Sequence, residues 1–186
     1  TTNKQNHPSV AALGDEGFVI AWQNEVTAPD ASFDVDVQMY HSNGLPKGPI
    51  FKASSSSEIY QTSPSVTGLK DGGFLISWNI YDTTDNKLEI FARNFYSDGE
   101  PRDDKFKVSN IPTFPAYSPK CLGLADGGFM VMWVQERNPG DSLDIFAQRC
   151  YVSGAFKGAD FRVNTQINCV QQVPSISTLS DSGFVI

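Results

Sequence analysis

Short segments of alternating residues recur along the chain and predict β-strands. The segments GFVIAW, GFLISW and GFMVMW begin at Gly17, Gly73 and Gly128. In an extended strand, each places Phe, an aliphatic residue and Trp on one face. The opposite face is also largely apolar, which indicates a strand inside a sheet with both faces buried. No long segment has a helical period, so the pattern predicts an all-β chain.

The segments belong to a tandem repeat. Pro8, Pro64, Pro119 and Pro174 lie 56, 55 and 55 residues apart, and the other distinctive positions keep this spacing. Such a fixed period is the signature of a repeat architecture. The repeated turn and core residues are Asp15, Gly17 and Trp22; Asp71, Gly73 and Trp78; Asp126, Gly128 and Trp133; and Asp181 and Gly183. The Asp-x-Gly pattern predicts a tight hairpin, because Asp can accept a local backbone hydrogen bond and Gly can take a positive φ. We therefore assign these residues a structural role.

Each copy of the repeat contains four predicted strands in about 55 residues, the size of a β-propeller blade. A single four-stranded sheet cannot bury two apolar faces, so neighbouring sheets must stack on it. The predicted fold is therefore all-β, with tandem four-stranded antiparallel repeats forming β-propeller-like blades. A linear array of stacked β-sheets is the alternative.

The predicted organisation is one repeat array over residues 1–186. We place repeat 1 at 8–63, repeat 2 at 64–118, repeat 3 at 119–173 and a partial repeat 4 at 174–186. Because the pattern stops inside a predicted buried strand, we expect the chain to be a segment of a longer repetitive polypeptide.

Charge and cysteine content narrow the possible functions. The net charge is −7, and an acidic chain without a basic cluster argues against nucleic-acid binding. No apolar run approaches the roughly 20 residues needed to span a bilayer. Cys121, Cys150 and Cys169 lack metal-ligand spacing and stand at apolar positions of the repeat. Buried structural thiols are the favoured interpretation, and a disulfide of unassigned pairing is the alternative.

The repeat resembles one found in very large secreted and surface proteins of bacteria and some protists. The resemblance is carried by the pattern PSV-x-x-L-x-D-G-G-F-x-x-x-W together with three segments of this chain, Pro174-Ser175-Ile176, Ile145-Phe146-Ala147-Gln148-Arg149 and Phe161-Arg162-Val163-Asn164. It covers essentially the whole chain. It implies an extracellular or cell-surface setting and a mostly structural role for the repeats.

Few residues suggest local chemistry. The only histidines are His7 and His41, and no known catalytic motif is present, so no catalytic residue is predicted. Acidic residues recur just before the third strand of each repeat, at Asp34, Glu89 and Asp144. With Asp82, Asp85 or Asp141 they could offer oxygen ligands to Ca²⁺, and solvated loop carboxylates are the simpler alternative. No other cofactor is expected.

The sequence therefore predicts a non-enzymatic structural or adhesive repeat module of a large extracellular or cell-surface protein, with a surface filament as one form of assembly. Its expected partners are further repeats of the same or like chains. The first alternative is a propeller that binds a glycan or protein through variable loops at 23–34, 79–89 and 134–144, where Phe33 and Tyr81 could supply exposed aromatics. The second is a hydrolase on a propeller scaffold, which requires a non-repeating polar cluster at one end. The linear sequence shows no such cluster.

Overall fold

The predicted all-β architecture is confirmed. The computed structural model describes residues 4–26, 32–54, 60–82, 86–109, 114–136, 142–166, 169–181 and 183–186. These residues form three four-stranded antiparallel sheets and a two-stranded hairpin. Within the described ranges no helix is present, and so none that is long and apolar enough to cross a membrane.

Strand order in each sheet follows chain order. Sheet 1 contains β1 (Lys4–Ala12), β2 (Phe18–Val26), β3 (Ser32–Tyr40) and β4 (Phe51–Lys52). Sheet 2 contains β5 (Gln61–Gly68), β6 (Phe74–Asp82), β7 (Lys87–Phe95) and β8 (Phe106–Lys107). Sheet 3 contains β9 (Ala116–Gly123), β10 (Phe129–Gln135), β11 (Asp144–Cys150) and β12 (Phe161–Arg162). The hairpin is β13 (Ser177–Thr178) and β14 (Phe184–Val185). In the three four-stranded sheets the first strand begins a few residues before its proline, whereas β13 begins after Pro174, and the exact repeat boundaries stay a prediction.

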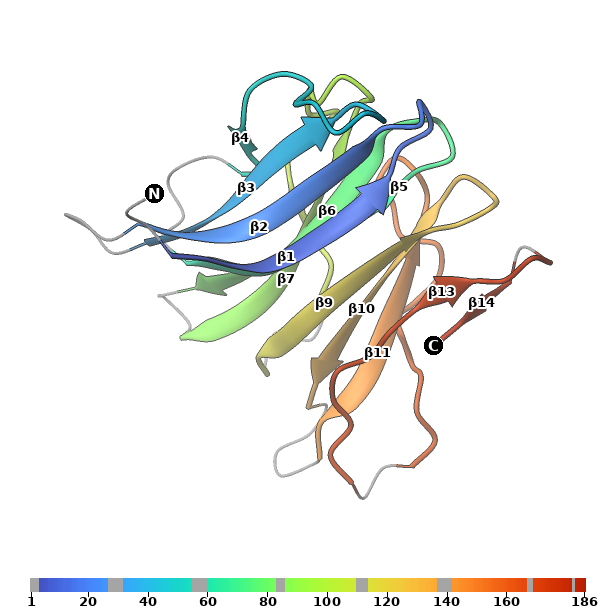
Figure 1. Cartoon of the computed structure of the whole chain (residues 1–186). Coiled ribbons are helices and arrows are strands. Elements are labelled where there is room, and N and C mark those ends of the chain that lie inside the picture. The colour runs from blue at the N-terminus through green and yellow to red at the C-terminus, as the bar shows by residue number, and fades with distance from the viewer. Residues whose placement is uncertain are drawn as a thin grey trace.

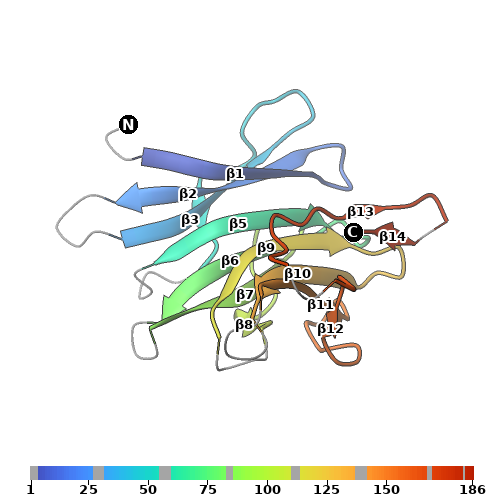
Figure 2. The same cartoon turned by 90° about the horizontal axis from the view of Figure 1, so that it is seen from below.

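The three sheets stack face to face like the blades of a fan (Figure 1). Their first strands, β1, β5 and β9, are neighbours, so they lie nearest the axis of the fan (Figure 2). This approach is close enough to require glycine. A Cβ at Gly68 would lie 2.4 Å from the carbonyl oxygen of Ala12, and one at Gly123 would lie 2.2 Å from that of Gly68. The first strands therefore approach one another too closely for a side chain at Gly68 or Gly123.

Each interface between sheets joins an aromatic face to an aliphatic face. The aromatic face of sheet 2, defined by Phe74, Ile76 and Trp78, packs on Val19 and Ala21 of sheet 1. The equivalent residues of sheet 3, Phe129, Val131 and Trp133, pack on Leu75, Ile90 and Ala92 of sheet 2. Trp78 and Trp133 are completely buried. In sheet 1 the equivalent residues, Phe18, Ile20 and Trp22, are only half-buried, because no sheet covers that face in the described structure.

The hairpins between first and second strands are built by the repeated aspartate. Asp71 Oδ1 accepts a hydrogen bond from the Gly73 amide at 3.1 Å, and the same contact recurs in the other repeats. The prediction that this glycine supplies a positive φ is wrong, since the positive φ belongs to the preceding residue, Gly72, Gly127 or Glu16. Gly73 is needed for another reason. A Cβ there would lie 2.3 Å from the carbonyl oxygen of Phe95, at the end of the adjacent strand.

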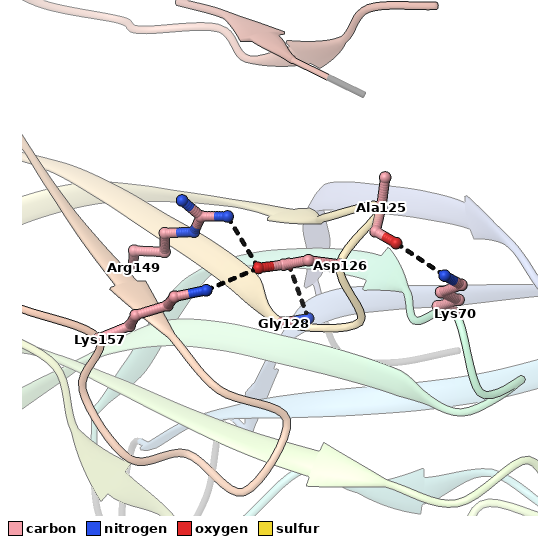
Figure 3. A network of polar contacts seen from close by, with 6 residues as sticks. All are labelled: Lys70, Ala125, Asp126, Gly128, Arg149 and Lys157. Atoms are coloured by element: carbon pink, nitrogen blue, oxygen red, sulfur yellow. Dashed lines mark hydrogen bonds and ion pairs between the residues drawn. The ribbon is translucent and has the colours of Figure 1, made fainter. Parts of the chain in front are cut away.

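The same aspartates also form ion pairs with lysine and arginine side chains. Asp126 Oδ2 contacts Arg149 Nη2 at 2.8 Å and Lys157 Nζ at 2.9 Å (Figure 3). Asp15 pairs with Lys47, and Asp71 pairs with Arg102, in the equivalent geometry. Lys70 also reaches from sheet 2 to the carbonyl oxygen of Ala125 in sheet 3. The Lys157 contact, followed by the Gly128 amide, lowers the pKa of Asp126 to about 2 from its usual 3.8.

Asp126→Asn is expected to remove this stabilisation while keeping the turn, since Asn can still accept from the Gly128 amide. Above about pH 4 the variant should be less stable by about 0.2–1 kcal/mol, the usual range for exposed ion pairs. Because the folded-state pKa lies below 3.8, the difference should shrink as the pH falls toward 2. Urea unfolding of both proteins at pH 6 and at pH 2 measures it. A difference that persists undiminished at the lower pH would contradict the ion-pair explanation.

Candidate functional site

The predicted calcium candidates all lie beside cations. Asp34 contacts Lys52 at 2.6 Å, Glu89 contacts Lys107, and Asp144 contacts Arg162 at 3.5 Å. Each pair joins the third strand of a sheet to its short fourth strand, so these carboxylates fasten that strand in place. No group of three His, Cys, Asp or Glu side chains suited to a metal occurs in the part of the chain that the structure describes. Asp85 and Asp141 lie outside that part, and calcium binding stays a prediction.

The three cysteines occupy two kinds of environment. Cys121 and Cys150 are buried with free thiols, as predicted, and burial raises the pKa of Cys150 to about 12. Cys169 is also a free thiol but is exposed, so the prediction of a buried thiol there is wrong. It lies beyond sheet 3, outside any strand, where the repeat pattern does not determine burial.

Two aromatics predicted for a binding surface pack on a third that the sequence did not single out. Phe33 and Tyr81 flank Tyr60, with ring centroids 5.9 Å and 5.8 Å from it. The three rings are half-buried against one another and link sheets 1 and 2. Because the three rings contact one another, they hold sheets 1 and 2 together and do not form an exposed surface for a ligand.

The first strands share a distortion near the axis. The residue before the repeated proline has a positive φ in all four repeats: His7 at 49°, Ser63 at 54°, Ser118 at 52° and Val173 at 54°. Residues before proline normally prefer extended conformations, and a positive φ is uncommon for residues other than glycine. A break in strand register accompanies it in each sheet. Strained backbone of this kind is concentrated at functional sites, which makes the axis a candidate site.

These four distorted residues line one pocket, which we call the axial pocket. It has a volume of about 260 Å³ and is also lined by Lys120. A second pocket of about 410 Å³ shares Ser118 and Val173 with it and contains Tyr117 and Glu136. We call this the side pocket. Both lie at the end where first strands begin and second strands end, which is also the end of the variable loops.

Register places the polar groups of the side pocket on one face of sheet 3. Tyr117 pairs directly with Val134, and Glu136 follows two residues later on the same face of the sheet. Tyr117 and Glu136 are therefore diagonal cross-strand neighbours, with Cα atoms roughly 7–8 Å apart in such pairs. Both side chains are half-buried. An acid and a phenol thus line the side pocket, which adjoins the axial pocket at Ser118 and Val173.

Two polar residues of the axial pocket break the repeat. His7 stands where the others have Ser63, Ser118 and Val173. Lys120 replaces a serine found as Ser9, Ser65 and Ser175. Glu136 of the side pocket matches Glu25 of repeat 1, and repeat 2 has Tyr81 at this position. The linear sequence does not show that these residues meet, because His7 and Lys120 lie in different repeats. A position-by-position comparison of the copies could have singled out His7 and Lys120 as departures from the repeat.

The fold is similar to that of several solved glycoside-degrading enzymes, while no family model and no curated protein sequence matches the chain. A Hadza microbial sialidase matches with a TM-score of 0.59 at 11% identity, over 77% of this chain and 35% of that one. The endo-arabinase of Bacteroides thetaiotaomicron matches with a TM-score of 0.57 at 16% identity, over 88% and 64%. The α-L-arabinofuranosidase of Lactobacillus brevis matches with a TM-score of 0.53 at 13% identity, over 86% and 53%. The chain thus spans less than two thirds of the length of each of these three enzymes.

These matches correct the functional prediction. The sequence predicted a non-enzymatic structural or adhesive module. The three solved structures of similar fold described above are enzymes by name, which contradicts that prediction and the prediction of no enzymatic activity. The physical reason is that stacking around an axis brings together residues from several repeats. His7 and Lys120, which do not recur in the other repeats, thereby line one pocket at the axis.

Proposed function

We propose that the chain forms the site-bearing part of a propeller enzyme that cleaves glycosidic bonds. The observation that supports this most is the position of Glu136 and Tyr117 beside the axial pocket. Concave sites with a few converging polar groups are the usual location of small-molecule chemistry. The names of the structurally similar enzymes suggest a carbohydrate as the substrate.

Glu136 is suited to proton transfer in this reaction. Cleavage of a glycosidic bond requires a proton on the leaving oxygen, and water finally adds to the anomeric carbon. A carboxylic acid commonly supplies that proton and then recovers one from the water. Val134 and Leu143 are apolar residues that line the same pocket as Glu136. We assign Glu136 the role of general acid and base.

Tyr117 is the second ionisable group that we place in the reaction. Most glycosidases use two carboxyl groups, but some use a tyrosine as the nucleophile. Among the described residues that line the two pockets, Glu136 is the only carboxylate. Tyr117, on the same face of sheet 3, is therefore the candidate to stabilise or attack the anomeric centre.

The test is release of reducing sugar from a panel of arabinans, sialosides and other plant and host glycans. Glu136→Gln should lower kcat by about 100-fold or more on any substrate that is cleaved, since general acid–base catalysis contributes at least this factor. Glu16→Gln is the matched control, because Glu16 is exposed at the hairpins of the opposite end and should leave the rate unchanged. Binding of a glycan without cleavage by the unaltered protein would contradict the enzymatic proposal and favour a glycan-binding propeller.

We further propose an extracellular or cell-surface setting and further repeats as partners. The resemblance of the PSV-x-x-L-x-D-G-G-F-x-x-x-W pattern to repeats of large secreted proteins supports both. Enzymes that act on polymeric glycans commonly meet their substrates outside the cell, which is consistent with that setting. Localisation of the tagged protein by fractionation of its native cells would test it.

A further inference from the structure

We propose that the axial pocket binds the carboxylate of an acidic sugar, with Lys120 as the main anchor. This inference rests on the proposed function in taking the ligand to be a sugar, and it adds the substrate class. A uronic acid joins the required groups: a carboxylate for the cation and a ring of hydroxyls for the neighbouring polar side chains. The inference depends on three independent features of Lys120 and its surroundings.

The first feature is that Lys120 makes no hydrogen bond, ion pair or ring contact with another described residue. In the ranges that the structure describes, every other lysine and every arginine contacts a carboxylate, a carbonyl oxygen, an aromatic ring or another group. Lys120 makes no such contact there, and its side chain is exposed into the axial pocket. An unpaired ammonium in a concave site, on a chain with net charge −7, is a local attractor for anions.

The second feature is that Lys120 cannot make the hydrogen bond that the equivalent serines of repeats 1 and 2 make with the next first strand. Ser9 Oγ accepts the Val66 amide at 3.0 Å, and Ser65 Oγ accepts the Cys121 amide at 3.2 Å. These bonds tie each first strand to the next one around the axis. A lysine ammonium has no acceptor, so at position 120 it cannot make this bond. A residue that departs from a structural repeat in this way is better explained by a ligand than by folding.

The third feature is the set of donors around Lys120. His7, Ser63 and Ser118 line the same pocket from three successive first strands. Hydroxyl and imidazole N–H groups can donate to a carboxylate or contact sugar hydroxyls. The positive φ at each of these residues costs conformational energy, and a binding role would explain why the chain tolerates that cost. Glu136 lies in the side pocket rather than in the axial pocket, so the cationic subsite and the acidic group are adjacent but separate.

Calorimetric titration of the 186-residue chain with matched sugars tests the proposal. Galacturonic and glucuronic acid should each bind at least about tenfold more tightly than galactose and glucose, as one charge-assisted contact predicts. Lys120→Gln should abolish this preference, and Lys120→Arg should largely retain it. Lys70→Gln is the control, because Lys70 is an exposed lysine at the opposite end. Unchanged melting temperatures of the variants would show that the fold is intact.

Each outcome of these titrations either supports or overturns the proposal that the axial pocket binds a sugar carboxylate. Equal binding of acidic and neutral sugars, or an unchanged preference in Lys120→Gln, overturns the proposal, as does failure of both acids to bind. Acetate or sulfate that binds as tightly as the uronates would also overturn it, since the site would then recognise any small anion. Uronate binding through Lys120 without cleavage of any glycan would uphold this inference while contradicting the proposed enzymatic function. Cleavage of neutral glycans alone would uphold the proposed enzymatic function while contradicting this inference.

Discussion

Trp78→Ala is expected to lower the free energy of unfolding by about 3–5 kcal/mol, the usual cost of removing a fully buried large aromatic side chain. Trp78 is completely buried between sheets 1 and 2, where it packs with Phe74 and Ile76 on the aliphatic face of sheet 1. The substitution removes apolar burial and leaves a cavity at the interface that holds the two sheets together. Urea denaturation followed by circular dichroism measures the loss.

Trp22→Ala is a matched control from the same chain. Trp22 occupies the equivalent position in sheet 1 but is only half-buried, because no sheet covers its face in the described structure. Its replacement should cost clearly less than that of Trp78, about half or less, because the removed area is smaller. Equal losses for the two variants would mean that the face of sheet 1 is covered in solution, contrary to the structure.

Gly128→Ala is expected to destabilise the chain by about 3 kcal/mol or more, at the upper end of the cost of forcing atoms into a packed site. The new methyl group would lie 2.4 Å from the carbonyl oxygen of Cys150. That oxygen belongs to backbone that is paired in register with Phe129, so it cannot move without disturbing β10 and β11. Thermal unfolding and the near-ultraviolet spectrum of the variant measure the effect.

Gly127→Ala separates steric contact from backbone conformation. Gly127 has a φ of 89°, and a Cβ there meets no atom within 4 Å. Its replacement should therefore cost about 1–2 kcal/mol, the penalty of a left-handed conformation for an L-residue. Repeat 1 carries Glu16 at this position with a φ of 66°, which shows that a side chain can be accommodated. A larger loss in Gly127→Ala than in Gly128→Ala would refute the assignment of roles within the turn.

Much of the fold follows from the sequence because its causes are local and repeated. Alternation around Trp22, Trp78 and Trp133 predicts the second strands, and Asp-x-Gly predicts the hairpins. The error over which turn residue has the positive φ arose because that choice depends on the third strand. The carbonyl of Phe95 or Cys150 approaches the second glycine from another part of the chain, and no local pattern reports that contact.

Much less of the candidate site than of the fold can be predicted from the sequence. His7 and Lys120 are departures from the repeat in different copies, and Glu136 recurs only as Glu25 of repeat 1. The linear sequence shows these differences, but it does not show which residues meet. His7 and Lys120 meet in the axial pocket because the first strands stack around one axis, and Glu136 lines the adjacent side pocket.

The sequence by itself determined the strand-forming pattern, the period of the repeat and the two apolar faces that require stacking, because these depend on neighbouring side chains and on burial. Only the tertiary structure decided which departures from the repeat converge, which of the described cations are held in structural contacts, and that Lys120 is not among those cations. Those properties depend on how whole sheets are placed relative to one another, and that placement is set by packing of the Phe, Ile and Trp faces on the aliphatic faces of their neighbours.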